Sequence, residues 1–151
     1  MYQREIVKCL DSLANVTVCI KPVLNYSDNK CSTIEIFKKL KNVQILQGLT
    51  FIQCLNKFAI KAVVMEFPST PLFEVIGKDV DIFLLADPIL PFSSDALYLL
   101  KKRVYFFEDL HELKSSLMQY LVGDLPILRN NEFYNKYGTR SQAKNHLKFK
   151  I

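Results

Sequence analysis

The sequence lacks the glycine-rich loops that commonly bind phosphate groups. Only four of its 151 residues are glycine, and neither G-x-G-x-x-G nor G-x-x-x-x-G-K-[ST] occurs. It also has no C-x-x-C spacing and no apolar run of the roughly 18 residues that a membrane span needs. These absences argue against a P-loop, a dinucleotide fingerprint and a transmembrane helix. Half of the residues are hydrophobic, which is typical of a globular domain.

Cysteine usage and the first residues indicate a cytoplasmic location. The four cysteines are Cys9, Cys19, Cys31 and Cys54. We expect buried free thiols in a reducing compartment, and the competing interpretation is a disulfide framework. Residues 1–15 carry four charges and lack the apolar core of a signal peptide.

The charge balance favours anionic partners without naming one. Twenty basic and 15 acidic residues give a net charge of +5, which suits nucleotides, lipid headgroups or nucleic acid. No aromatic and basic RNA-binding signature occurs, so we expect no nucleic-acid partner. His111 and His146 are far apart and lack neighbouring acid or cysteine ligands, so we expect no metal site and no cofactor.

Alternating apolar strands and helical segments predict the fold. The strands are expected at 16–20, 43–46, 60–65, 81–86 and 104–107, and the helices at 2–14, 34–40, 51–58, 93–100 and 109–122. Ser93 or Ser94 and Asp109 are the expected N-caps, with Glu112 completing a capping box. Continuous apolar strands are typical of parallel sheets covered on both faces. The pattern predicts an α/β, Rossmann-like three-layer fold, a parallel sheet of about five strands flanked by helices.

The segment 66–74, EFPSTPLFE, is the strongest site candidate. It follows the strand 60–65 and opens a short helix, so Ser69 and Thr70 fall at the carboxyl end of a strand, where ligands bind in open α/β sheets. This placement suggests a site for an anion such as a nucleotide phosphate. The alternative is simple N-capping, which Thr70 before Pro71 fits well. Glu74 is not at the capping-box position and is either a ligand contact or a surface carboxylate.

Two further positions at strand ends are weaker candidates. Lys21 follows the strand 16–20 and is either a solvated lysine or a phosphate ligand. Residues 87–88, Asp-Pro, follow the strand 81–86 and form either a turn or part of a pocket.

Three segments resemble a known family. They are residues 16–22 (VTVCIKP), residues 63–70 (VVMEFPST) with Glu74 following, and the strand 81–86 with the helix and strand over 97–107. Together they resemble the C-terminal, donor-binding half of GT-B-fold glycosyltransferases that build bacterial capsule and lipopolysaccharide. The likeness covers roughly residues 5 to 137. It implies a nucleotide-sugar-binding domain over 1–137 and a basic tail or helix over 138–151.

The resemblance implies a role for each candidate residue. Ser69 and Thr70 would contact the phosphates of a nucleotide-activated sugar, Glu74 the ribose hydroxyls, and Lys21 the diphosphate. The sequence departs from the family pattern because no histidine follows Lys21, and because Lys61 stands where an acidic residue is common.

The acceptor-binding domain of that family, which usually supplies the catalytic base, has no counterpart in the chain. We therefore expect an enzyme part that works with a separate acceptor domain and transfers no sugar alone, and no catalytic residue is assigned. The alternative is a non-catalytic Rossmann-like interaction module.

From Asn135 to Ile151 the chain has no acidic residue and carries a basic repeat. Lys136, Arg140, Lys144 and Lys148 recur at every fourth position and would share one face of a helix. This is either a solvated end or a contact with an anionic surface, namely a partner domain or the inner leaflet of a membrane. The tail offers little apolar area, so membrane contact would be peripheral and salt-sensitive.

Overall fold

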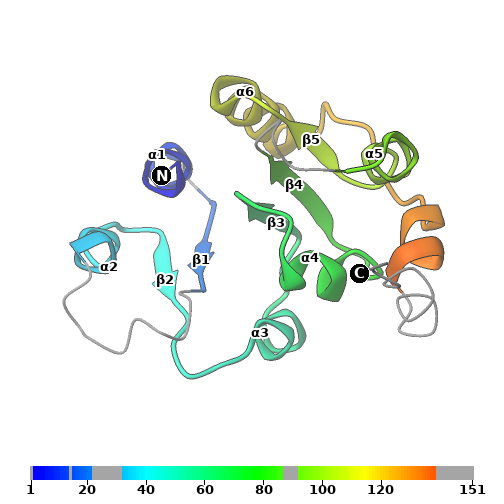
Figure 1. Cartoon of the computed structure of the whole chain (residues 1–151). Helices are drawn as coiled ribbons and strands as arrows, with labels where there is room; N and C mark the ends of the chain where they lie inside the picture. The colour runs from blue at the N-terminus through cyan, green and yellow to red at the C-terminus, as the bar shows by residue number, and fades with distance from the viewer. Residues whose placement is uncertain (1, 14, 22–31, 87–91, 139–151) are drawn as a thin grey trace. The chain divides into compact units, whose positions relative to one another are not determined.

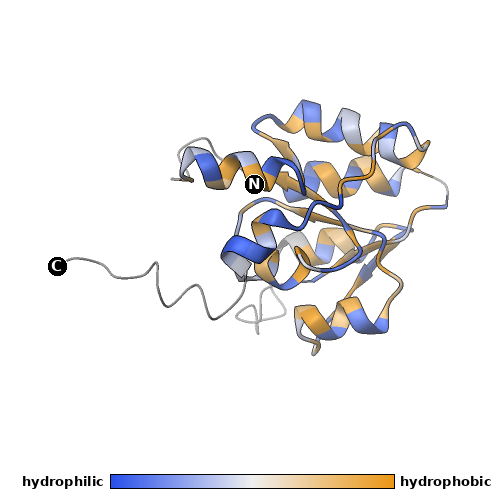
Figure 2. Ribbon diagram, turned by 90° about the vertical axis from the view of Figure 1, so that its right-hand side faces the viewer, coloured by the Kyte–Doolittle hydropathy of each residue, from blue (hydrophilic) through white to orange (hydrophobic). Residues whose placement is uncertain are grey.

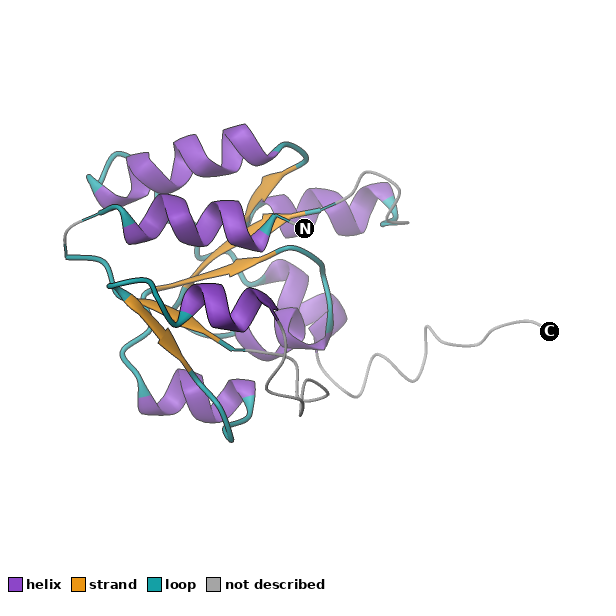
Figure 3. Ribbon diagram, turned by 90° about the vertical axis from the view of Figure 1, so that its left-hand side faces the viewer, coloured by secondary structure: helices purple, strands orange, loops and turns teal. Residues whose placement is uncertain are grey.

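In a computed structural model of the chain, the described residues are 2–13, 15–21, 32–86 and 92–138. Short strands alternate with helices throughout these ranges (Figure 3). The chain divides into two compact units, Met1–Ala59 and Ile60–Ile151, each of which is considered by itself. Every strand pairing in the described residues is parallel, which confirms the predicted α/β, Rossmann-like class.

The first unit holds a two-stranded sheet. Its elements are α1 (Gln3–Asp11), β1 (Val18–Ile20), α2 (Ser32–Phe37), β2 (Val43–Ile45) and α3 (Phe51–Lys57). Strands β1 and β2 pair with Val18 opposite Val43. Val7, Ile20 and Phe37 form the buried centre of this unit, so α1 and α2 both pack on the face of β1 that carries Ile20.

The second unit holds a three-stranded sheet in the order β3–β4–β5 (Figure 1). Its elements are β3 (Ala62–Met65), α4 (Thr70–Val75), β4 (Asp81–Leu85), α5 (Ser94–Lys101), β5 (Tyr105–Phe107), α6 (Leu110–Leu121) and the π-helix η1 (Tyr134–Gly138). Every residue of the central strand β4 is buried. Right-handed crossovers place α4 and α5 on one face of this sheet. Helix α6 contacts β4 and β5.

Local sequence signals account for several helix boundaries. Ser93 caps α5, because its hydroxyl accepts a hydrogen bond from the Ala96 amide at 3.2 Å. Asp109 caps α6 by accepting from the amides of His111 at 2.7 Å and Glu112 at 3.0 Å. Both N-caps confirm the sequence prediction. The helices show distinct apolar and polar faces (Figure 2), and α6 buries Leu113 and Leu117.

The five strands lie within the predicted ranges, but their pairing has a feature that the pattern did not anticipate. They hydrogen-bond as two groups, β1–β2 and β3–β4–β5, among the described residues. Cys9, Cys19 and Cys54 are free thiols, as expected, but only Cys54 is buried, and Cys9 and Cys19 are half-buried. Cys31 lies outside the described residues. Burial, with a smaller contribution from Cys54, raises the pKa of Cys19. None of the helices in the described ranges has the length and apolar character that crossing a bilayer requires.

Candidate functional site

The predicted anion site lies at the carboxyl end of β3. The strand ends at Met65, a turn follows, and α4 begins at Thr70. Ser69 and Thr70 are both exposed residues. The side chain of Glu74, one helical turn further on, is half-buried. The structure therefore brings these three residues together on one short helix and the turn before it.

The capping interpretation needs a correction of one residue. The N-cap of α4 is Ser69 rather than Thr70, because the Leu72 amide donates to the Ser69 carbonyl at 2.8 Å and closes the first turn there. The Ser69 backbone is extended, with φ −112° and ψ −175°, as an N-cap should be. Its hydroxyl makes no capping hydrogen bond with the described residues. Capping thus leaves the Ser69 hydroxyl available for another role.

The structure does not place the other predicted site residues in one site with Ser69 and Thr70. Lys21 directly follows β1 in the first unit, and its side chain is half-buried. A cleft between Lys21 and Ser69 would span two units and stays a prediction. Residues 87–88 lie outside the described residues, and so does His146. His111 is exposed on α6, as expected for a residue without a site role.

A shallow, open depression lies elsewhere in the second unit. It runs along β5, with Lys101 of α5 and Ser116 of α6 on its sides. The Lys101 ammonium sits 4.8 Å from the centre of the Phe106 ring, in a cation–π contact. None of the predicted site residues lines this depression.

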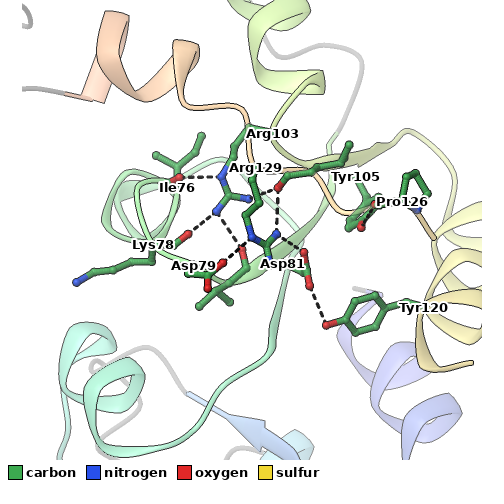
Figure 4. A network of polar contacts seen from close by, with 11 residues as sticks. Ile76, Lys78, Asp79, Asp81, Arg103, Tyr105, Tyr120, Pro126 and Arg129 are labelled. Atoms are coloured by element: carbon green, nitrogen blue, oxygen red, sulfur yellow. Dashed lines mark hydrogen bonds and ion pairs between the residues drawn. The ribbon is translucent and has the colours of Figure 1, made fainter. Parts of the chain in front are cut away.

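Sequence reasoning missed a buried polar cluster centred on Arg103 (Figure 4). Arg103 is only 1% exposed. Its guanidinium donates to the carbonyls of Ile76 at 2.9 Å, Lys78 at 2.6 Å, Val80 at 3.0 Å and Leu128 at 3.2 Å. Burial, and next the nearby charge of Arg129, lower the pKa of Arg103, yet an arginine stays protonated in a protein.

Asp81, the first residue of β4, contributes a carboxylate to this cluster. It accepts from the Tyr120 hydroxyl at 2.9 Å and from Arg129, whose Nε also donates to Asp79 at 2.6 Å. Burial by itself would raise the pKa of Asp81, but the hydrogen bonds from Arg129 and Tyr120 outweigh it and hold the pKa below its usual value. Burial and the bond to Asp81 raise the pKa of Tyr120 to about 12.

The many internal hydrogen bonds of this cluster give it a structural role in joining distant segments. It lies where β4 and β5 begin, at the edge of the sheet opposite the strand ends that carry ligands in α/β folds. Buried side-chain polar atoms in the described residues all have hydrogen-bond partners. Nothing in the local sequence around Arg103 marks it as buried, since its acceptors are main-chain carbonyls from distant segments.

Metal binding finds no support in the described part of the chain, where no three His, Cys, Asp or Glu side chains gather. Comparison with protein-family models, with curated proteins and with solved structures gives no match to this chain.

Proposed function

We propose that this chain is the donor-binding part of a glycosyltransferase of the surface-polysaccharide type and binds a nucleotide-activated sugar. The observation that supports it best is the pair of exposed hydroxyls, Ser69 and Thr70, at the carboxyl end of β3 in a parallel sheet. The Ser69 hydroxyl is not used for capping. These two hydroxyl groups are hydrogen-bond donors suited to phosphate oxygens.

Glu74 adds a carboxylate to the two hydroxyl groups of Ser69 and Thr70. It lies on α4 one turn after Thr70 and is half-buried. A carboxylate accepts hydrogen bonds and suits a pair of sugar hydroxyls rather than a phosphate. A nucleotide with its phosphates at Ser69 and Thr70 and its ribose toward Glu74 matches this order of groups.

Within this proposal the chain binds and does not complete the reaction. Donors aimed at a diphosphate would stabilise the charge that develops on the leaving nucleotide as the glycosidic bond breaks. A separate acceptor-binding domain would supply the acceptor and the base. Lys21 and the basic tail remain candidates for the diphosphate and for an anionic membrane surface, respectively.

Titration of the full chain with uridine and cytidine diphosphates, followed by calorimetry or NMR, tests the proposal. Ser69→Ala and Thr70→Val should each weaken nucleotide binding about tenfold or more, because each removes a hydrogen bond to a charged group. Ser115→Ala is the matched control, since Ser115 is an exposed hydroxyl on α6. It should leave the affinity unchanged.

A second ligand separates the two parts of the site. Inorganic pyrophosphate has phosphates and no ribose, so its binding should depend on Ser69 and Thr70 and not on Glu74. Glu74→Ala should weaken nucleotide binding only. If neither common nucleotides nor pyrophosphate bind the wild-type chain, the proposal fails and the non-catalytic interaction module is favoured.

A further inference from the structure

Residues 125–138, called the C-terminal strap below, are tied to the rest of the second unit along their whole length. The strap starts at the edge where β4 and β5 begin. There the Tyr105 hydroxyl donates to the Pro126 carbonyl at 2.5 Å and Arg103 donates to the Leu128 carbonyl at 3.2 Å. Arg129 pairs with Asp79 and Asp81 just before and at the start of β4.

The middle of the strap packs on α4. Phe133 is 2% exposed, and its ring centre lies 6.3 Å from that of Phe73 on α4. The ring of Tyr134 lies against Gly77, two residues beyond the end of α4, where a Cβ atom would come within 3.0 Å of it. The absence of a side chain at Gly77 lets the ring approach the backbone.

The far end of the strap reaches the first turn of α5. The Tyr137 hydroxyl donates to Asp95 at 2.9 Å, and Lys136 forms an ion pair with the same carboxylate. Figure 1 shows η1, in orange, beside α5. Helix α5 follows β4, so its first turn lies at the carboxyl edge of the sheet. The strap therefore runs from the amino edge to the carboxyl edge along α4 and α5.

Helix α4 needs outside support to hold its position. It has six residues, and isolated helices of fewer than about 12 are unstable in water. Its first turn also lacks a side-chain cap from Ser69. Leu72 and Val75 anchor its inner face, each fully buried. On the outer side, Phe73 meets Phe133 of the strap.

We propose that the C-terminal strap is the positioning element of the carboxyl-edge site, with Phe133 as the positioning residue that holds α4 and thereby Ser69 and Thr70. The strap touches α4 at Phe73, three residues after Thr70, so a change at Phe133 acts on the site through the helix and without touching a ligand. The effect of the strap on ligand binding rests on the proposed function. The effect of the strap on the stability of α4 does not depend on it.

Amide hydrogen exchange of the full chain tests the proposal. In Phe133→Ala, exchange of the α4 amides should speed up at least tenfold more than exchange of the β4 amides, because α4 loses its outer contact while β4 keeps its own. Leu117→Ala is the matched control. Leu117 is equally buried but lies on α6, which packs on β4 and β5, so its loss should not single out α4.

The outcomes are distinct. If α4 and β4 lose protection in the same proportion in Phe133→Ala, or if α4 exchange does not change, the strap does not position α4 and the proposal is wrong. Phe133→Leu should give a smaller effect of the same kind, and it replaces the alanine variant if that variant does not fold.

Nucleotide titration of the same variants addresses the site. Phe133→Leu should weaken binding of uridine diphosphate several-fold, and Leu117→Ala should not. Equal affinity in wild type and Phe133→Leu would show that α4 placement does not matter for the ligand and would overturn the binding half of the inference. If the wild-type chain binds no nucleotide, the proposed function is wrong. The comparison of amide hydrogen exchange in α4 and β4 still decides whether the strap positions α4.

Discussion

Replacing Arg103 with methionine should destabilise the chain strongly. Arg103 is buried, and its four hydrogen bonds to carbonyls tie Leu128 in the strap to Ile76, Lys78 and Val80 between α4 and β4. Methionine fills part of the volume and donates none of these bonds.

The size of the effect follows from the balance of two contributions. Hydrogen bonds to a charged group contribute about 1.5 kcal/mol each at the low end, so four of them amount to about 6 kcal/mol. Removing the buried charge recovers part of its desolvation cost, which is several kcal/mol. We expect a net loss of about 3 kcal/mol, a large part of the 5–15 kcal/mol that folded domains typically have.

Equilibrium unfolding in urea, monitored by circular dichroism, measures this change through the midpoint and the slope. Arg103→Lys should recover less than half of the loss, because an ammonium cannot reach four carbonyls with the planar fork of a guanidinium. Arg4→Met is the surface control, since Arg4 is exposed on α1, and should change stability by less than about 0.5 kcal/mol. A loss below about 1 kcal/mol in Arg103→Met would refute the reasoning.

The pKa of Asp81 is lower in the folded state than the usual value of about 3.9, so its contribution to stability is present above that pH and is lost as pH falls through the folded pKa. Asp81→Asn should therefore flatten the fall in the urea midpoint below about pH 4, and parallel curves for both proteins would contradict this. The purified chain should transfer no sugar, and turnover of a nucleotide sugar above roughly 1 per second would overturn that expectation. The basic tail should co-sediment with anionic vesicles at low salt and less so at physiological salt. Equal sedimentation with neutral vesicles, or none at low salt, would rule out this membrane contact, in which Lys136 would have to leave Asp95.

Local signals in the sequence determined much of the second unit. The apolar run over 81–86 became the buried strand β4, because such a run is stable only when both faces of a strand are covered. Ser93 and Asp109 capped the helices that follow them, because a cap depends on amides two or three residues away. The same local logic placed Ser69 and Thr70 after a strand end, where the structure has them.

Only the tertiary structure decided which distant groups meet. Arg129 pairs with Asp81 across 48 residues, and the carbonyls around Arg103 come from segments 23 to 27 residues earlier and 25 residues later. No periodicity encodes such contacts, because they form when chain closure brings the segments together. The strap is a similar case. Its sequence mixes polar and apolar residues, yet only Phe133 among residues 125–138 is buried, with its ring near those of Phe73 on α4 and Tyr137. The sequence therefore specified the strands and the caps, while the packed fold determined the Arg103 cluster and the path of the strap.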